Sequence, residues 1–153
     1  MNYTATITWQ RQPGEEFEKG KYSRVHHWEF DGGMKIAASS SPNVVPLPMS
    51  DASLIDPEEA FLASISSCHM LFFLSIAAKK KLVVEHYEDH VQGTMGKNGE
   101  GKISMLTAIL NPKIIFSGTE KPSKETIRQI HELAHDNCYI ANSVKTVIQI
   151  ITN

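Results

Sequence analysis

The stretch that most constrains this chain is DPEEAFLASISSCHMLFFLSIAAKKK, from Asp56 to Lys81. It begins with a helix start signal, because Asp56 can cap a helix, Pro57 suits the first turn, and Glu59 follows the cap by three residues, as in a capping box. Apolar and small residues fill nearly every later position, on all faces of the predicted helix. A helix that is apolar all round is buried all round. The stretch therefore predicts a long, buried central helix.

The same stretch is long enough to span a membrane, because Ala60 to Ala78 is a run of 19 residues. Six polar or weakly polar side chains lower its hydrophobicity: Ser64, Ser66, Ser67, Cys68, His69 and Ser75. The rest of the chain alternates like β-structure in water and offers no second span. We therefore expect a buried helix of a soluble protein and no membrane partner.

Length, charge and cysteine content limit the function further. At 153 residues the chain predicts a single domain, residues 1–153, which is large enough to bury a core. The net charge of -2, with no basic cluster beyond Lys79 to Lys81, gives no basis for nucleic-acid binding. The first residues, MNYTATITWQRQ, lack the apolar stretch of a signal peptide, so we expect a cytoplasmic protein. In that reducing compartment, two cysteines are expected to be free, catalytic or metal-bound.

The remaining elements follow from alternation and turn residues. Six strands are predicted, over Thr4–Trp9, Tyr22–Phe30, Met34–Ser39, Leu82–Met95, Lys102–Phe116 and Val144–Thr152. The fifth of these is expected to be interrupted near Pro112. The turns Asp31-Gly32-Gly33 and Asn98-Gly99 join neighbouring strands. Helical spacing predicts a second helix over Lys124–Asn137, with Cys138 at its end. This order of elements predicts an α+β fold.

Cys68, in the middle of the predicted central helix, is the first candidate for chemistry. A cysteine in an apolar helix can be an inert core residue. Its neighbours Ser66, Ser67 and His69 are polar where packing alone favours Ala or Leu, which favours a functional thiol. The second cysteine, Cys138, lies at a helix end. Two such thiols fit a nucleophile and a resolving partner that cycle through sulfenic acid and disulfide.

Glu58 lies at the start of the same helix, where a carboxylate can simply favour the positive end of the helix dipole. It cannot serve Cys68 of its own helix, because ten residues at about 1.5 Å each separate the two by roughly 15 Å. If the long helices of two copies packed antiparallel about a twofold axis, Glu58 of one copy could approach Cys68 of the other. The apolar helix independently favours such a homodimer.

A metal site is an alternative reading of the second helix. His131, His135 and Cys138 are spaced at i, i+4 and i+7, so a continued helix would place them on one face. With Cys68 or His69 as a fourth ligand, they have acceptable spacing for a metal. No CxxC pair strengthens this reading, and an ordinary exposed helix face with two histidines explains the same spacing. No cofactor is expected.

The string DPEEAFLASISSCHM, followed by AHDNCYIANSV before the closing strand, resembles the OsmC/Ohr family of thiol peroxidases. The resemblance covers the order of elements, the ten-residue step from Glu58 to Cys68, and the late cysteine. The strings HHWEFDGG, SSSPNVVPLP and SSCHM resemble an uncharacterised OsmC-like branch of that family. The resemblance implies an intertwined homodimer in which β-sheets from both chains wrap two long central helices.

By the same resemblance, Cys68 would be the thiolate that attacks a hydroperoxide, and Cys138 would then form a disulfide with it. A dithiol, such as a lipoyl protein, would reduce that disulfide. An apolar environment raises the pKa of a thiol, so the thiolate needs a cation beside it. By the same resemblance, Glu58 of the neighbouring subunit would hold that cation. Unlike the OsmC group, this chain has no Lys or Arg between Ser39 and Asp56. Arg24, placed early as in the Ohr group, is the expected cation; the alternative is an exposed strand arginine.

The expected substrate class is organic hydroperoxides. Leu54, Ile55, Phe61, Phe72 and Phe73 are available to line an apolar mouth that would favour organic over hydrogen peroxide, although each is equally explained as a core residue. A non-catalytic module of the same fold that binds a small apolar or electrophilic ligand is the other alternative.

Overall fold

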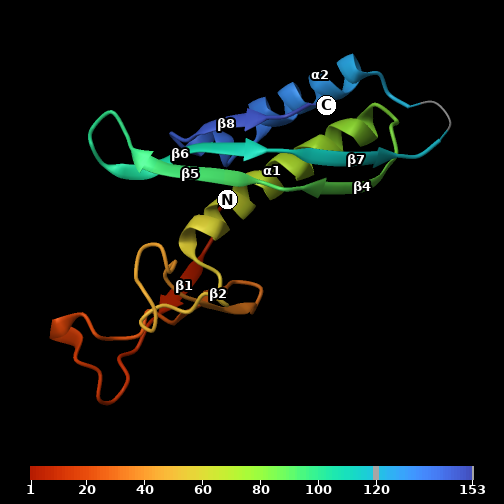
Figure 1. The fold of residues 1–153 in the computed structure, drawn as a ribbon. Coiled ribbons are helices and arrows are strands. Elements are labelled where there is room, and N and C mark those ends of the chain that lie inside the picture. Colours follow the sequence, from red (N-terminus) through yellow and green to blue (C-terminus); the bar gives the residue numbers. More distant parts are fainter. Residues whose placement is uncertain (119–120, 153) are drawn as a thin grey trace. The chain divides into compact units, whose positions relative to one another are not determined.

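The computed structural model describes residues 1–118 and 121–152. The chain divides into two compact units, Met1–Ala60 and Phe61–Asn153. The boundary falls inside the long helix α1, Pro57–Lys79 (Figure 1). Helices, antiparallel sheets and a mixed sheet occur together, which confirms the predicted α+β class.

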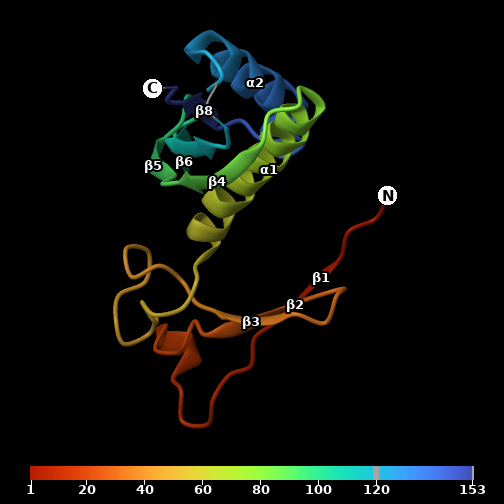
Figure 2. The same cartoon turned by 90° about the vertical axis from the view of Figure 1, so that its right-hand side faces the viewer.

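The first unit contains a three-stranded antiparallel sheet, seen along the lower part of Figure 2. Its strands, in order across the sheet, are β1 (Ala5–Thr8), β2 (His26–Phe30) and β3 (Lys35–Ala38). A short 3-10 helix, η1 (Phe17–Lys19), lies in the connection between β1 and β2. The predicted hairpin between β2 and β3 is present, and Gly33 adopts the positive φ of 82° that its turn requires.

Strand β2 begins four residues later than the predicted strand, so Arg24 lies in a loop and the expectation of a strand arginine was wrong. The backbone N–H of Arg24 donates to the carbonyl of Met49 at 2.8 Å. The next N–H, of Val25, is taken by the hydroxyl of Ser23 at 3.1 Å. The N–H groups of Arg24 and Val25 are therefore not available for hydrogen bonds to a neighbouring strand, and the pairing of β2 in the sheet starts at His26.

The second unit contains two sheets and the helix α2. Strands β4 (Val84–Asp89) and β7 (Pro112–Phe116) form one antiparallel pair, and β5 (Gln92–Lys97), β6 (Ile103–Leu110) and β8 (Val147–Ile150) form a mixed sheet. Strands β6 and β8 run parallel. Helix α2 spans Lys124–Asn137, as predicted, and a 3-10 helix, η2 (Ala141–Ser143), follows it.

The predicted strands Leu82–Met95 and Lys102–Phe116 are each divided in two, which the sequence analysis did not anticipate beyond a break near Pro112. Asp89 supplies the reason, because its carboxylate accepts a hydrogen bond from the backbone N–H of Asn111 at 2.7 Å and another from the hydroxyl of Ser66 on α1. Pro112 has no N–H to give to a ladder. Each of the two predicted strands is therefore interrupted at this point, and the chain continues in the other sheet.

Both ends of α1 are set by local hydrogen bonds. The backbone N–H of Glu59 donates to the Asp56 carboxylate at 2.8 Å, and the N–H of Asp56 donates to the Glu59 carboxylate at 3.2 Å. This reciprocal pair is the predicted capping box. At the other end, the N–H of Leu82 reaches the carbonyl of Ala77 at 3.0 Å while Lys81 adopts a left-handed φ of 60°. That arrangement is a Schellman motif.

Within one chain, α1 is buried along one stripe, so the expectation of burial on every face is wrong for the single chain. The buried residues recur at every fourth position: Ile65, His69, Phe73 and Ala77. An opposite stripe is exposed and consists of Ala63, Ser67, Leu71 and Ser75. Leu71 is 62% exposed. Among the residues that the structure describes, α1 is the one helix whose length and composition would suit a membrane span.

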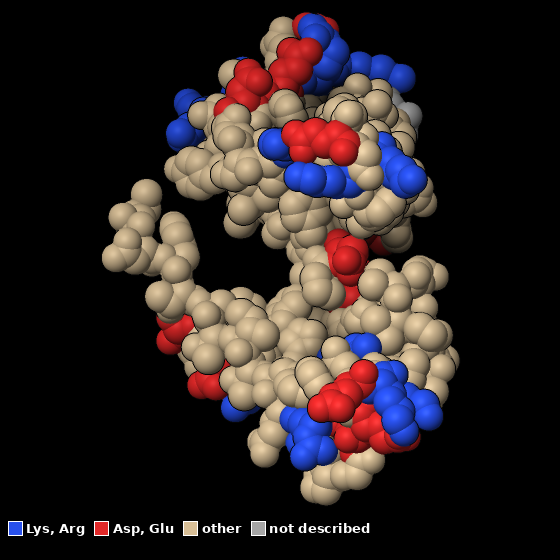
Figure 3. Space-filling model, turned by 90° about the vertical axis from the view of Figure 1, so that its left-hand side faces the viewer, with Lys and Arg blue, Asp and Glu red and all other residues tan. Residues whose placement is uncertain are grey.

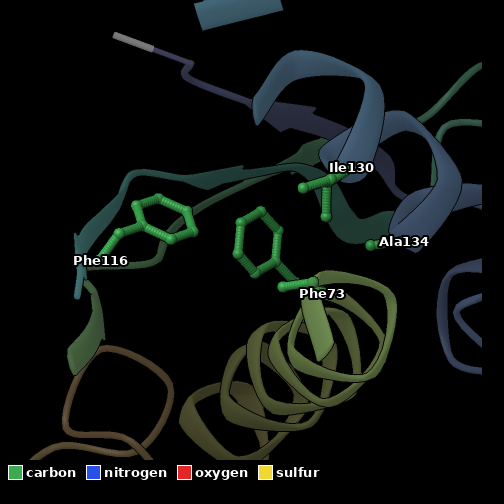
Figure 4. Close-up of a cluster of buried hydrophobic side chains, with 5 residues drawn as sticks. Phe73, Phe116, Ile130 and Ala134 are labelled. Atoms are coloured by element: carbon green, nitrogen blue, oxygen red, sulfur yellow. The ribbon is translucent and has the colours of Figure 1, made fainter. Parts of the chain in front are cut away.

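Two apolar clusters hold α1 in the second unit. Phe73 packs with Phe116, Ile130 and Ala134, where α1, β7 and α2 meet (Figure 4). Ile65 packs with Ala108 and Leu110 of β6. Cys68 lies between these two anchor points on α1, so the packing fixes the helix on both sides of the thiol.

Candidate functional site

Cys68 opens into a hollow of about 470 Å³ in the second unit. The hollow is lined mainly by α1 and by the segment that follows α2, including Ser64, Leu71, Phe72, Tyr139 and Ile140. The rings of Phe72 and Tyr139 meet edge to face, with their centroids 5.1 Å apart. Cys68 is a free, half-buried thiol, so a small molecule that enters this apolar hollow can reach its sulfur.

Cys138 directly precedes Tyr139 and Ile140, which line that hollow. Helix α2 ends at Asn137, and Cys138 itself adopts an extended backbone conformation with ψ of 112°. Its side chain is 1% exposed. The Sγ atom accepts a hydrogen bond from the N–H of Ala141 at 3.4 Å, and the Cys68 side chain lies close enough to affect the pKa of the Cys138 thiol. Two cysteines that are 70 residues apart in the sequence are thus neighbours as free thiols.

The two thiols have different surroundings. Burial raises the pKa of the Cys138 thiol to about 11, and the neighbouring Cys68 thiol acts in the same direction. The N–H of Ala141 partly opposes this rise. Cys138 is therefore protonated at neutral pH, while Cys68 is the thiol that faces the hollow.

Arg24 and Glu58 lie together in the first unit, where both line a hollow of about 530 Å³. The guanidinium of Arg24 lies over the ring of Tyr22, 3.4 Å from its centroid. Its Nη1 atom donates to the carbonyls of Gly20 and Tyr22. The loop before β2 thus holds the arginine in place, and its positive charge borders the hollow near the start of α1.

An aromatic trio borders the same hollow, and the sequence analysis did not identify it. Phe17 and Tyr22 stack with centroids 4.5 Å apart, and Trp9 meets Tyr22 edge to face at 5.5 Å. The indole N–H of Trp9 donates to the carbonyl of Ser23 at 2.8 Å. The sequence feature that could have revealed this trio is the presence of three aromatic residues within 14 positions, just before Arg24.

The residues expected to line an apolar mouth lie in several places. Phe72 lines the Cys68 hollow. Phe61 packs against the cluster around Ile65, and Phe73 lies in the other cluster. Leu54 and Ile55 belong to the first unit, where the carbonyl of Ile55 accepts a hydrogen bond from the N–H of Ser39.

His69, which directly follows Cys68, forms a buried pair with His131. The sequence alone did not predict that these two histidines pair. His69 Nε2 and His131 Nδ1 are 2.9 Å apart, and the rings are nearly parallel, at 6°, with centroids 5.2 Å apart. The two side chains are 1% and 2% exposed. Burial lowers the pKa of His69 to about 3 and that of His131 to about 4. The nearby imidazoles of His131 and His135 lower the pKa of His69 further. Both rings are neutral at physiological pH.

The geometry does not support the metal reading of this region. Across residues 1–118 and 121–152, no group of three or more His, Cys, Asp or Glu side chains is arranged to hold a metal ion. His131 is engaged with His69, and Cys138 leaves the helical series because α2 ends before it. The predicted alignment of His131, His135 and Cys138 on one continued helix face is therefore wrong.

Charged side chains show no concentration of one sign on the face drawn in Figure 3, where acidic and basic groups are interspersed. Several of them form exposed pairs, such as Arg128 with Glu125 at 2.7 Å. Exposed pairs of this kind contribute little to stability.

Comparison with known proteins identifies the family. Residues 50–153 match the sequence pattern of OsmC-like proteins. An OsmC-like protein of unknown function from Vibrio cholerae is 52% identical, with a TM-score of 0.96 over 99% of this chain and 98% of that one. Among the curated proteins, none matches significantly.

More distant solved structures share the fold. An organic hydroperoxide resistance protein from Elizabethkingia anophelis is 17% identical, with a TM-score of 0.71 over 98% of this chain and 92% of that one. An organic hydroperoxide resistance protein of Bacillus subtilis is 16% identical, with a TM-score of 0.64 over 98% and 96%. The matched sequence pattern covers more than half of the chain and the Vibrio relative covers nearly all of it. The chain therefore belongs to the OsmC/Ohr family of OsmC-like proteins.

Proposed function

We propose that this protein is a thiol peroxidase that reduces organic hydroperoxides through Cys68 and Cys138. The observation that carries the proposal is the proximity of the two free thiols, of which Cys68 faces an apolar hollow and Cys138 is buried. The names of two structural relatives, both organic hydroperoxide resistance proteins, point to the same substrate class.

The proposed cycle has three balanced steps. The Cys68 thiolate attacks the outer oxygen of a hydroperoxide ROOH, the O–O bond breaks, and after uptake of a proton the products are Cys68 sulfenic acid and the alcohol ROH. The Cys138 sulfur then attacks the Cys68 sulfur, which forms a disulfide and releases water. A dithiol, such as a dihydrolipoyl group, reduces that disulfide and is itself oxidised to its cyclic disulfide. We place this cycle in the cytoplasm, where reductants keep both thiols free.

The assignment of roles rests on exposure and pKa. Cys68 lines the hollow, whereas Cys138 is 1% exposed and its raised pKa keeps it protonated at neutral pH. A protonated, buried thiol is a poor first nucleophile. Once Cys68 is oxidised, however, the sulfur of Cys138 is already nearby in the same chain, so the second step is intramolecular.

The lining of the hollow supports an organic substrate. Leu71, Phe72, Tyr139 and Ile140 offer apolar and aromatic surface beside the Cys68 sulfur. Such surface stabilises a bound alkyl or aryl group, which hydrogen peroxide lacks. The expected preference is therefore for hydroperoxides that carry a hydrocarbon group.

Cys68 also needs a neighbouring cation to favour its thiolate. We propose that Arg24 of a second copy supplies it in a homodimer, with Glu58 of that copy beside it. Two observations support this: Arg24 and Glu58 line one hollow in the first unit, and the stripe Ala63, Ser67, Leu71 and Ser75 leaves α1 open to another helix. Small residues on such a stripe allow two helices to approach closely.

The first experiment is intact-mass analysis of reduced protein after one equivalent of cumene hydroperoxide. We expect prompt loss of two hydrogens in the wild type, and in Cys138→Ser a sulfenic acid on Cys68 that dimedone traps. Cys68→Ser should show neither product. No mass change in the wild type over minutes, or peroxidase turnover retained in Cys68→Ser, contradicts the proposed function.

A mixing experiment tests the shared site. Cys68→Ser and Arg24→Ala homodimers are each expected to be weakly active, but a mixed dimer contains one site with both Cys68 and Arg24. Unfolding and refolding the two variants together should therefore restore activity, up to about half per refolded mixed dimer if the sites act independently. Mixed dimers without restored activity would place Arg24 and Cys68 in the same chain or remove Arg24 from the site.

A further inference from the structure

Helices α1 and α2 contact each other mainly through apolar side chains. Phe73 of α1 packs against Ile130 and Ala134 of α2 (Figure 4). Ala77 lies in the same cluster. Apolar contacts of this kind are not directional. They hold two helices together but set their rotation and register only through shape. The orientation of Cys68 toward Cys138 therefore needs a more specific contact.

The buried histidine pair supplies a directional contact between the same two helices. A hydrogen bond between two imidazoles requires one nitrogen to donate and the other to accept, so it forms between neutral rings in one geometry. The ring of Phe73 lies 4.5 Å from that of His131 and packs against it. A rotation or slip of α1 would break the hydrogen bond and leave both nitrogens unpaired among apolar groups, which costs free energy.

His69 and His131 are placed so that their hydrogen bond can restrict the positions of the two cysteines. His69 follows Cys68 on α1, so the two side chains rotate together with the helix. His131 precedes Cys138 by seven residues, and α2 ends at Asn137, directly before Cys138. The imidazole hydrogen bond therefore joins the two elements on which the neighbouring thiols of Cys68 and Cys138 are placed.

We propose that His69 and His131 form a positioning pair, whose hydrogen bond sets the orientation of α1 against α2 and so keeps the Cys68 and Cys138 sulfurs within bonding distance. Neither imidazole touches the reacting sulfur or oxygen atoms in this role. The inference rests on the proposed function in one respect, because it assigns the pair to the disulfide step of that cycle.

The test compares two double variants with the wild type. In H69Q/H131N, the Gln amide replaces the Nε2 atom of His69 and the Asn amide replaces the Nδ1 atom of His131, so the hydrogen bond is kept. In H69M/H131L, apolar side chains of similar size fill the same space without it, and removal of both partners together leaves no unpaired group. Circular dichroism and thermal unfolding at pH 7 show whether each variant is folded; if H69M/H131L is not, H69Q/H131L replaces it.

The measured quantity is the equilibrium constant of the Cys68–Cys138 disulfide in a glutathione buffer at pH 7, where oxidised glutathione takes the two electrons and two thiols of glutathione are released. We expect H69Q/H131N to stay within about threefold of the wild type and H69M/H131L to fall about tenfold, the effect of losing one buried hydrogen bond. Equal constants for all three proteins, or an equal fall in both variants, overturn the proposal.

A second readout separates this inference from the proposed function. If the wild type forms no disulfide with oxidised glutathione, the two-cysteine cycle fails. Dibromobimane, which becomes fluorescent when it links two neighbouring thiols, then reports their proximity in reduced protein without any oxidation. Fast linking in the wild type and H69Q/H131N with slow linking in H69M/H131L supports the positioning pair, and equal linking rates reject it.

Discussion

The imidazole rings of His69 and His131 lie nearly parallel, at 6°, and share a hydrogen bond of 2.9 Å inside an otherwise apolar contact between α1 and α2. Burial holds the pKa of both rings well below the ordinary value of 6.5, at about 3 for His69 and about 4 for His131. Neutral imidazoles are thus part of the native packing, and this has a measurable effect on the pH dependence of stability.

We predict that the protein loses stability as the pH falls below about 6.5. The pKa of each histidine is lower in the folded than in the unfolded state, so the unfolded state binds more protons in this range. The contribution of the pair is complete above pH 6.5 and declines toward pH 4. At pH 5 the loss is on the order of 2 kcal/mol for each histidine.

Urea unfolding at pH 7 and pH 5 measures this loss, with H69Q/H131N as the control that keeps the hydrogen bond but cannot titrate. The difference between the two pH values should be smaller in the variant than in the wild type. An equal difference in both proteins would assign the acid sensitivity to other groups.

Arg24→Ala should make the Cys68 thiol less reactive near neutral pH, if Arg24 of a second copy is the cation of the site. The physical reason is that a nearby positive charge favours the thiolate, and its removal favours the thiol. The rate of alkylation of Cys68 by iodoacetamide, followed from pH 5 to pH 10 in the Cys138→Ser background, measures this reactivity. Arg24→Lys is the matched control, since it keeps the charge but not the planar guanidinium. A pH profile that does not change in Arg24→Ala removes Arg24 from the thiolate environment.

Lys81→Gly should stabilise the protein. Lys81 adopts a φ of 60° at the end of α1, a left-handed conformation that glycine adopts without steric cost. The gain, after subtraction of the greater freedom of glycine in the unfolded chain, is about 0.5–1 kcal/mol. Thermal unfolding against Lys80→Gly, a neighbour before the left-handed position, measures it. A lower unfolding midpoint in Lys81→Gly would contradict the prediction.

Asp89→Ala should destabilise the second unit by about 2–3 kcal/mol, because it leaves the N–H of Asn111 and the hydroxyl of Ser66 without their acceptor. Asp89→Asn keeps one acceptor oxygen and should cost less. Urea unfolding of the two variants and of Ser66→Ala separates the two hydrogen bonds. Equal stability of Asp89→Ala and wild type would show that this carboxylate is not a structural anchor.

Local signals in the sequence predicted the elements that depend on neighbouring residues. The capping box at Asp56 and Glu59 and the bounds of α2, Lys124–Asn137, follow from residues within one or two helical turns. The α+β class followed from the order of elements. Sequence alone could not predict the division of the two long strands, because Asp89 reaches Asn111 across 22 residues.

The candidate site, too, could be predicted from the sequence only where it depends on neighbouring residues. Cys68 and Cys138 were identified as chemical candidates, but their proximity depends on how α1 and α2 pack across 70 residues of sequence. His69 and His131 form their pair through the same packing and carry no local motif. Arg24 was expected on a strand and lies in a loop, because backbone hydrogen bonds to Met49 and Ser23 end the sheet ladder early.

The carboxylate of Asp89 also determines where this chain can accept added length. It ties α1 to the junction at which both long β-segments pass from one sheet to the other. An insertion on either side of that junction would separate the carboxylate from its partners and uncouple the two sheets. The hairpin tip at Asn98–Gly101 is largely exposed and bonded to itself, with the Asn98 side chain accepting from the N–H groups of Glu100 and Lys102. Peptide tags and reporter loops therefore belong at this tip, far in sequence from both cysteines.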